Sequence, residues 1–447
     1  MKDKTAGIFR LLALVAVMFI GISVIIPQYT VQDDEIVIPA WSDVGENDEC
    51  IKTVFVKGLI YGNGSDKFGV DDVFTASEAA YAAVRMYEEK NKKEYSFDGF
   101  GREKCSEYID KARSYGIWAD NLPTDDEGLT RRSIAAVLAP LVDDNKEGGL
   151  TEFYGSEEYK DSILKLYNLG IALDSNIVNA FSDTPVTKSE AAQLVVMCIA
   201  PQKRLKIVIP DTDGLKAVLE SKMSEYQGDW SLYYEDYNTG SVISINSHQV
   251  YSASLIKLFV AQAVYEKANN GTLSLSPKVE DEIRKMITYS DNDAWKYLAR
   301  LLGGGSYSAG MTAVTKTAQA SGFSDTGQFY QGKHKNFNFT SVNDCGRYLR
   351  GILNGTIVSY EYSEKILSLL KQQQHTQKIP AGVPDGIETA NKTGELDYVQ
   401  GDAAIVYAPD GPYILVIIGD NLDDGYSQIN KITDLSKIVY EYLNKAE

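Results

Sequence analysis

The chain has 447 residues, which is too long for a single hydrophobic core and predicts two or three domains. Its 62 acidic residues outnumber its 44 basic residues, and the formal charge of -18 argues against nucleic acid as a partner, because phosphates would repel it. The histidines, His248, His334 and His375, lie far apart and no Cys/His spacing resembles a zinc site, so we expect chemistry without a metal or other cofactor.

The N-terminus combines three basic residues in its first ten positions with an uncharged apolar run of 16 residues from Leu11 to Ile26. Basic residues stay on the cytoplasmic side of a membrane, so the rest of the chain is expected to be exported. The run is slightly short for a membrane span, and no A-x-A cleavage site follows it. We therefore expect residues 1–26 to be a retained signal anchor, with a cleaved signal peptide as the alternative, and residues 27–49 to be an acidic linker.

Residues 50–202 contain three copies of one pattern. Each copy has a helix-like segment, a glycine followed by a large apolar residue, a turn-rich loop and a second helix. The first and third copies match best, because Gly58 to Thr75 and Gly170 to Thr187 are both 17 residues apart. One copy could not bury its apolar stripe alone, so the three copies should pack into one all-α unit.

The second helix of the first and third copies begins with a capping box, in which Thr75 and Thr187 are each followed three positions later by a glutamate. The pattern resembles the S-layer homology module, which typically occurs in threes. That family usually carries T-R-A-E here, and its arginine helps to bind an acidic cell-wall polymer. Only Arg131 retains the basic residue, with Lys188 as a partial substitute. The resemblance implies weak binding to a secondary cell-wall polymer, and a degenerate helical spacer is the alternative.

Residues 203–214 are expected to be a linker, and residues 215–447 are expected to form an α+β domain. An amphipathic helix opens this domain and precedes two strands, WSLYYEDY and GSVISINS, which are joined by an NTG turn. Helices dominate from Ser254 to about Gln374, after which the strand-like runs AAIVYAP and YILVIIG precede a closing helix. Strands on both sides of a helical middle place the two ends of the domain on one sheet.

Three short motifs carry the chemistry of this domain. They are SLIK at Ser254 to Lys257, SDN at Ser290 to Asn292, and KTG at Lys392 to Gly394. Ser254 opens an apolar helix, where side chains at i and i+3 share a face, so Lys257 should reach the serine hydroxyl. Burial and a second cation, which we assign to Lys392, would lower the pKa of Lys257 toward a neutral base. Ser254 is therefore the predicted nucleophile.

The remaining motif residues are expected to surround the substrate. Ser290 would lie between the two lysines and relay a proton to the leaving nitrogen, while Asn292 would bond the substrate amide. Thr393-Gly394 would border the substrate, because glycine lets the backbone approach it closely. The backbone N–H groups of Ser254 and Glu395 would hold the oxyanion.

The domain resembles the penicillin-recognising serine enzymes, and it is most similar to the class A β-lactamases. The three motifs occur in the family order, and the run KIPAGVPDGIETANKTG matches the class A sequence through KTG. The resemblance implies a β-lactamase-like layered α/β/α domain behind the all-α repeat module. It also implies an acyl-enzyme on Ser254, formed from a β-lactam or the D-alanyl-D-alanine end of a peptidoglycan stem peptide. The enzyme would work outside the membrane, at the cell wall.

Two departures from the family pattern affect the expected mechanism. Class A hydrolases carry a glutamate after SDN that activates the deacylating water, but no glutamate occurs between Asn292 and Ser359. Asp325 is the nearest acid, and we interpret it as a turn or cap residue of a loop. Ser254 and Ser290 are also only 36 residues apart, which is short for the family.

Losing a positioned general base typically costs ~10²–10⁴ in rate, so acylation should be competent and β-lactam turnover slow. Two other readings stay open. One is a catalytically weak or inactive penicillin-binding protein that attaches to the wall. The other is an esterase that uses the same S-x-x-K chemistry.

Overall fold

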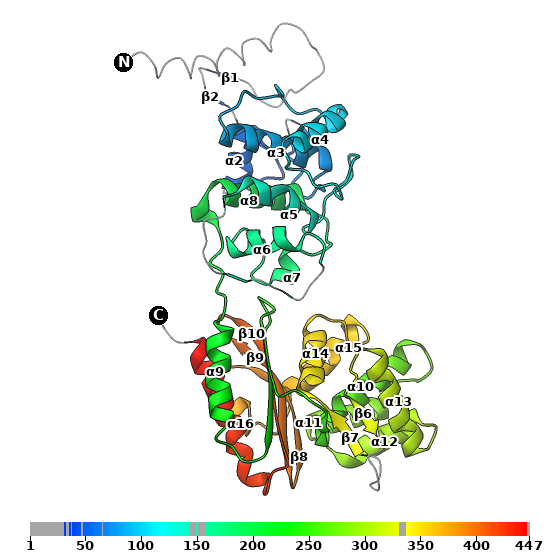
Figure 1. The fold of residues 1–447 in the computed structure, drawn as a ribbon. Coiled ribbons are helices and arrows are strands. Elements are labelled where there is room, and N and C mark those ends of the chain that lie inside the picture. Colours follow the sequence, from blue (N-terminus) through cyan, green and yellow to red (C-terminus); the bar gives the residue numbers. More distant parts are fainter. Residues whose placement is uncertain are drawn as a thin grey trace. The chain divides into compact units, whose positions relative to one another are not determined.

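The computed structural model describes residues 31–32, 35–36, 38–45, 48–64, 66–143, 149–150, 153, 157–329 and 337–444. The predicted signal anchor lies outside these ranges. Within them, no helix has the length and apolar character that a membrane span requires. The chain divides into two compact units, Met1–Ile209 and Pro210–Glu447, and the division falls inside the predicted linker (Figure 1).

The first unit is helical apart from a short pair of strands. Its elements are β1 (Val31–Gln32), β2 (Glu35–Ile36), α2 (Glu49–Val56), α3 (Ala76–Lys90), α4 (Cys105–Ser114), α5 (Ser133–Leu138), α6 (Lys160–Asn168), α7 (Ile177–Ala180) and α8 (Lys188–Ile199). The pairs α2/α3, α4/α5 and α6/α8 occupy the three predicted copies and share one apolar core. Trp41 is buried in that core, with its ring 4.9 Å from Phe55, so the unit begins earlier than the predicted linker allows.

The predicted helix caps are present. The Thr187 N–H donates to Glu190 Oε2 at 3.0 Å, and the Glu190 N–H donates to Thr187 Oγ1 at 3.2 Å. A capping box also starts α3 at Thr75. In the middle copy, Ser133 takes the place of the glutamate. The Thr130 N–H donates to Ser133 Oγ at 2.9 Å, and the Ser133 N–H donates to Thr130 Oγ1 at 3.1 Å. The caps thus satisfy helix N–H groups that the helix leaves unpaired.

The second unit is built on a five-stranded antiparallel sheet with the order β4-β3-β10-β9-β8. Its strands are β3 (Asp229–Asp236), β4 (Val242–Ile245), β8 (Thr389–Leu396), β9 (Val399–Ala408) and β10 (Gly411–Asp420). Helices α9 (Thr212–Met223) and α16 (Ile429–Leu443) cover one face, and the remaining helices lie on the other face (Figure 1). The strands come from both ends of the domain, which confirms the predicted α+β layered fold.

The helical middle of the domain contains a small sheet that was not predicted. The helices are α10 (Ile256–Asn269), α11 (Pro277–Thr288), α12 (Asn292–Leu302), α13 (Tyr307–Ala320), α14 (Val342–Leu353) and α15 (Tyr360–Lys371). The small sheet has the order β5-β7-β6 and consists of β5 (Val250–Tyr251), β6 (Gly327–Phe329) and β7 (Phe337–Thr340). β5 directly precedes the turn that carries Ser254, so this sheet fixes the start of that turn.

The KTG segment differs from the prediction. The strand-like run predicted in this segment was AAIVYAP, but β8 already begins at Thr389, and the chain turns at Asp397-Tyr398, where Leu396 pairs with Val399. KTG therefore lies within β8, which has a strand neighbour only on its β9 side among the residues that the structure describes. An edge strand leaves part of its backbone unpaired, and this edge faces the motif residues.

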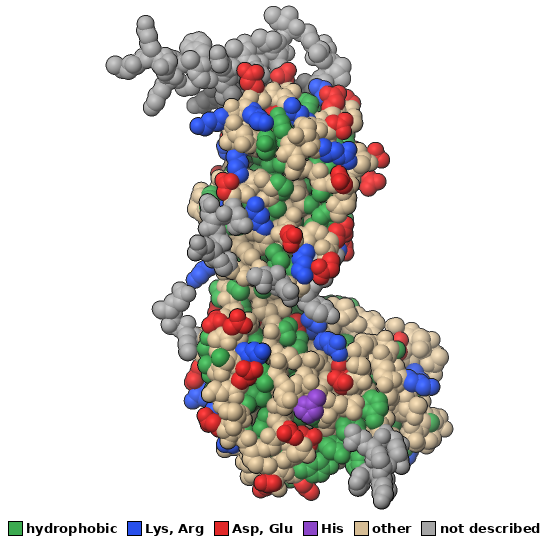
Figure 2. All heavy atoms as spheres, viewed as in Figure 1, with side chains coloured by type: hydrophobic (Ala, Val, Ile, Leu, Met, Phe, Trp, Pro, Cys, Tyr) green, Lys and Arg blue, Asp and Glu red, His purple; other side chains and the backbone are tan. Residues whose placement is uncertain are grey.

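Acidic and basic side chains are mixed on the surface. On the face drawn in Figure 2, lysine and arginine side chains alternate with aspartate and glutamate over both units. Opposite charges thus compensate each other locally on this face, although the chain carries a net charge of -18.

Candidate active site

The predicted nucleophile and its lysine are in direct contact. Ser254 lies in a single 3₁₀ turn (Ala253–Leu255) that leads into α10, and Lys257 lies one turn later on the same face. The Lys257 Nζ is 2.9 Å from the Ser254 Oγ. Lys257 is buried, whereas Ser254 is partly exposed, so the base lies beneath a hydroxyl that a substrate can reach.

The SDN loop brings Ser290 between the two lysines. Lys257 Nζ donates to the Ser290 carbonyl at 2.5 Å and to Asn292 Oδ1 at 2.8 Å, and lies 3.3 Å from Ser290 Oγ. Lys392 Nζ donates to the same hydroxyl at 2.8 Å. Ser290 has a left-handed backbone with φ of +57°, and the side chain of Asp291 caps α12 directly after it. A strained conformation held by a cap keeps both oxygens of Ser290 directed at Lys257.

Burial changes the protonation of both lysines. It lowers the pKa of Lys257 to about 8, against an opposing effect of the nearby Asp291 carboxylate. It lowers the pKa of the fully buried Lys392 further, and the charge of Lys257 adds to that shift. The cation–cation effect therefore acts on Lys392, whereas the sequence had suggested that it would act on Lys257.

The glycine of KTG allows β8 to pack against the nucleophile turn. A Cβ atom at Gly394 would lie 2.9 Å from the Ser252 carbonyl oxygen and 3.1 Å from Leu255 Cγ, so a larger residue would separate the strand from the turn. Thr393 is buried next to it, and Glu395 follows on the same edge strand. The roles of Thr393 and of the Glu395 N–H toward a substrate stay predictions.

Sequence reasoning missed two further buried ions near KTG. Lys378 is fully buried, and its Nζ lies 3.0 Å from Glu395 Oε1. Asp402 is also fully buried and accepts a hydrogen bond from Asn391 Nδ2 at 3.0 Å, while burial raises its pKa to about 6. Lys378 opens the KIPAGVPDGIETANKTG run, which was a usable signal. No comparable signal in the sequence pointed to Asp402, because the residues that it faces depend on the register of β8 and β9.

No described carboxylate downstream of SDN is hydrogen-bonded to the nucleophile, Ser254. The Asp325 N–H donates to Asp344 Oδ2 at 2.9 Å, and its carbonyl accepts from Gln249 Nε2 at 3.2 Å, which suits the turn role that we predicted. Over the ranges that the structure covers, no carboxylate is hydrogen-bonded to Ser254. Instead, the ring of Trp295 faces Lys257, with its centroid 5.9 Å from Nζ.

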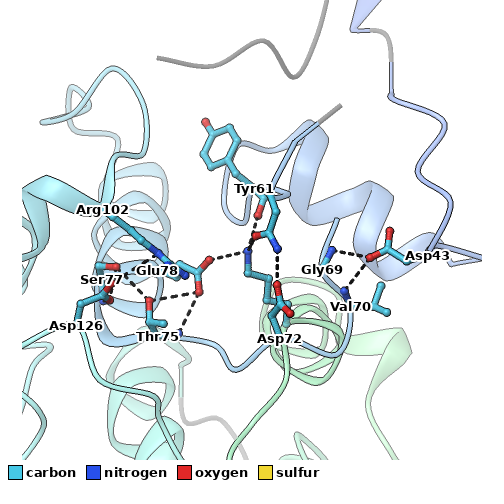
Figure 3. Close-up of polar contacts among 12 residues, drawn as sticks. Asp43, Tyr61, Gly69, Val70, Asp72, Thr75, Ser77, Glu78, Arg102 and Asp126 are labelled. Carbon is cyan, nitrogen blue, oxygen red and sulfur yellow. Dashed lines mark hydrogen bonds and ion pairs between the residues drawn. The ribbon is translucent and has the colours of Figure 1, made fainter. Parts of the chain in front are cut away.

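The two predicted wall-binding cations lie in the first unit and form ion pairs there. Lys188 is 2% exposed, and its Nζ lies 2.8 Å from Glu78 Oε1 and 2.7 Å from Asn63 Oδ1. Figure 3 shows the Glu78 carboxylate in this network, where the Thr75 N–H also donates to it at 3.0 Å. Arg131 pairs with Glu190. These contacts give both cations a structural role, and their binding to a wall polymer stays a prediction.

The pairs follow a cyclic order around the three copies. Lys188 of the third copy pairs with the capping glutamate of the first copy, and Arg131 of the second pairs with that of the third. The remaining combination would join the first copy to the second, but the corresponding residues are Ala76 and Ser133. The cation and the carboxylate of this third pair are thus both replaced by uncharged residues.

The second unit is similar to a known protein family and to several solved structures. The model of the β-lactamase enzyme family matches residues 213–282 and 275–443. The structure of PBP-A is 23% identical and covers 54% of this chain and 100% of its own, with a TM-score of 0.47. A PBP-A variant in an acyl-enzyme complex with penicillin G is 22% identical, with the same coverage and TM-score. A β-lactamase from Sphaerobacter thermophilus DSM 20745 is 21% identical, covers 53% and 99%, and has a TM-score of 0.46.

No curated protein matches the sequence. The family match runs from residue 213 to residue 443, which is more than half of the 447 residues. The chain therefore belongs to the β-lactamase enzyme family.

Proposed function

We propose that the second unit is an active serine hydrolase that forms an acyl-enzyme on Ser254 from a β-lactam or a D-alanyl-D-alanine-type peptide. The observation that carries the proposal is the 2.9 Å contact between Ser254 Oγ and Lys257 Nζ, with Ser290 Oγ shared between Lys257 and Lys392. A protein that had lost its catalysis would have no need to keep two buried lysines on one serine hydroxyl, because burying such charges is costly.

Acylation follows from these contacts. Neutral Lys257 takes the proton of Ser254, and Ser254 Oγ forms a bond with the carbonyl carbon of the substrate. The backbone N–H groups of Ser254 and Glu395 hold the oxyanion. When the carbon–nitrogen bond breaks, Ser290 gives its proton to the leaving nitrogen and receives one from the protonated Lys257. The lysine is thus neutral again after one acylation.

The protonation of Lys257 limits this reaction at low pH. With a pKa of about 8, Lys257 is neutral in roughly a tenth of the molecules at pH 7. That fraction is large for a lysine, since an unperturbed amine would be almost entirely charged. Burial therefore supplies the base form without any histidine.

Deacylation is the slow step in this proposal. Water must attack the ester carbon while the bond to Ser254 Oγ breaks, and a general base normally removes the water proton. The backbone N–H of Asp325 donates to Asp344 Oδ2, and no glutamate occurs between Asn292 and Ser359. We expect a penicilloyl ester that persists, and thus a peptidase or penicillin-binding protein more than a fast β-lactamase.

We further propose that the enzyme works outside the cytoplasmic membrane, anchored or wall-associated. The support is the basic and apolar sequence of residues 1–26 and the three helical copies ahead of the catalytic unit. Protease accessibility of the catalytic unit on intact cells tests this location.

A fluorescent penicillin tests the enzyme proposal. Wild-type protein should gain a covalent label that the Ser254→Ala variant does not gain. Intact-mass detection after the reagent is removed then follows the loss of the label. An unlabelled wild-type protein, or label that persists in Ser254→Ala, would sink the acyl-enzyme, and rapid nitrocefin turnover would contradict the slow deacylation.

A further inference from the structure

The aromatic ring of Trp295 lies beside the base and takes no part in the steps above. Trp295 follows Asn292 by three positions on α12, so both side chains project from one face of that helix. Lys257 donates to Asn292 Oδ1 at 2.8 Å, and the same Nζ lies 5.9 Å from the centroid of the Trp295 ring. α12 thus covers the base with one polar and one large aromatic side chain.

The next helix and the small sheet hold this ring in place. α12 packs against α10 and α13 (Figure 1), and the ring of Tyr307 at the start of α13 meets the Trp295 ring edge to face, with centroids 5.6 Å apart. Burial raises the pKa of Tyr307, and side-chain hydrogen bonds with Gln328 and Asn338 oppose this rise. The Asn338 carbonyl accepts from the Ser252 N–H at 3.0 Å. A chain of contacts therefore ties the Trp295 ring to the nucleophile turn.

Protein groups surround the amine of Lys257. Its polar contacts are Ser254 Oγ, both oxygens of Ser290, and Asn292 Oδ1. Lys257 is 1% exposed, although Ser254 and Trp295 are partly exposed. An aromatic ring attracts a charged amine within about 6 Å of its centroid. The distance of 5.9 Å is at that limit, so the larger effect of the ring on this base is the exclusion of water.

We propose that Trp295, held by Tyr307, is a positioning residue that keeps water away from Lys257 and thereby sets the lifetime of the acyl-enzyme. The inference rests on the proposed function, because it concerns the base of the same site. In hydrolysis, a water oxygen bonds to the ester carbon while the bond to Ser254 Oγ breaks. Neutral Lys257 can take the water proton and return one to Ser254 Oγ. A ring that denies water this place leaves Lys257 competent for acylation and unable to complete hydrolysis.

Two substitutions of Trp295 test the cover. Trp295→Ala removes the ring, whereas Trp295→Phe keeps an aromatic ring and removes the indole N–H, which has no hydrogen-bond partner among the described residues. The acyl-enzyme of a fluorescent penicillin is freed of reagent, and loss of the label is followed by intact mass at about pH 9, above the pKa of about 8 of Lys257. Trp295→Ala should shorten the lifetime at least about tenfold, a part of the usual ~10²–10⁴ that a base contributes once water reaches it. Trp295→Phe should change it less than about threefold.

Two further variants make the test specific. Tyr307→Ala frees the Trp295 ring without deleting it and should also shorten the lifetime. Tyr297→Ala is the matched control, because Tyr297 is a second partly buried aromatic residue of α12 whose ring faces Lys278, with 4.7 Å between the centroid and Nζ. It should leave the lifetime unchanged. An unaltered lifetime in Trp295→Ala, or the same shortening in Trp295→Phe or Tyr297→Ala, would overturn the inference.

A measurement without any acyl donor separates this inference from the proposed function. NMR titration of ¹⁵N-labelled lysine side chains gives the pKa of Lys257 in the free full chain. Water admitted by Trp295→Ala should raise that pKa by about one unit or more, because hydration favours the charged amine. The other charged groups near this amine, the Asp291 carboxylate and the Lys392 ammonium, are the same in both proteins.

The two failures are then distinct. If wild-type protein does not label at Ser254 but the pKa of Lys257 rises in Trp295→Ala, the proposed function fails and the cover stands. An unchanged or lowered pKa in Trp295→Ala would show that the ring does not keep water from the base, whatever the labelling result.

Discussion

The ammonium nitrogen of Lys392 lies 2.8 Å from the hydroxyl oxygen of Ser290, which joins the KTG strand to the SDN loop across 102 positions of sequence. Lys257 lies 3.3 Å from the same hydroxyl on the other side. The charge of Lys257 makes the neutral form of the buried Lys392 easier to reach. The hydroxyl is consequently a route by which a proton can pass from the nucleophile toward a leaving group.

Lys392→Ala removes one end of this route. Acylation by a fluorescent penicillin should slow by about 10²–10⁴, the usual contribution of a positioned proton-transfer group. Lys392→Arg keeps the charge but not the shape of the buried ammonium, so it should recover only part of the rate. Rates come from labelling time courses, and thermal melting checks that each variant is folded. Unchanged labelling in Lys392→Ala would remove the lysine from the mechanism.

The pH dependence of acylation reports on Lys257. Its pKa is lowered to about 8, so the neutral base accumulates as the pH rises toward that value. The acylation rate should therefore increase about tenfold for each pH unit well below 8 and level off above it. Labelling rates between pH 5.5 and about 9 test this, with a stable β-lactam. A rate that falls over this range would mean that protonated Lys257 is the active form.

Much of the domain could be predicted because its ends are long and regular. β10 is a run of apolar residues, and the predicted closing helix occupies Ile429–Leu443. The sheet β5-β7-β6 could not be predicted, because strands of two to four residues are too short to show a period. Its pairing depends on tertiary contacts instead.

The same distinction applies to the site. Ser254 and Lys257 are three residues apart on one helical turn, so their contact follows from local geometry. The position of KTG inside β8 depends on a two-residue turn after Leu396, which the sequence did not mark with glycine or asparagine. Asp402 comes to lie opposite Thr393 only through the register of β8 and β9, and sequence spacing cannot reveal that register.

Gly394→Ala tests the contact between β8 and the nucleophile turn. The added methyl group would lie 2.9 Å from the Ser252 carbonyl, so the strand or the turn must move. Overpacking of this kind typically costs about 1–3 kcal/mol, and the displaced turn should also slow acylation. Gly45→Ala is a control, since nothing lies within 4 Å of a Cβ there. Denaturation and penicillin labelling are both measured, and normal values for Gly394→Ala would contradict the tight contact.

Lys188→Met tests whether the repeat cations are structural. The substitution leaves Glu78 buried without its cation, and removing one partner of a buried pair typically costs about 3–5 kcal/mol of unfolding free energy. Lys188→Met/Glu78→Gln should lose less, because no unpaired charge remains while the amide can still cap α3. Lys160→Met, which removes an exposed pair with Glu157 in the same unit, should cost less than about 1 kcal/mol. Hydrogen exchange in α3 and α8 reports on this unit separately from the catalytic one. If Lys188→Met instead leaves exchange unchanged and abolishes cosedimentation with cell walls, the lysine serves the wall polymer and the structural account of the ion pair is wrong.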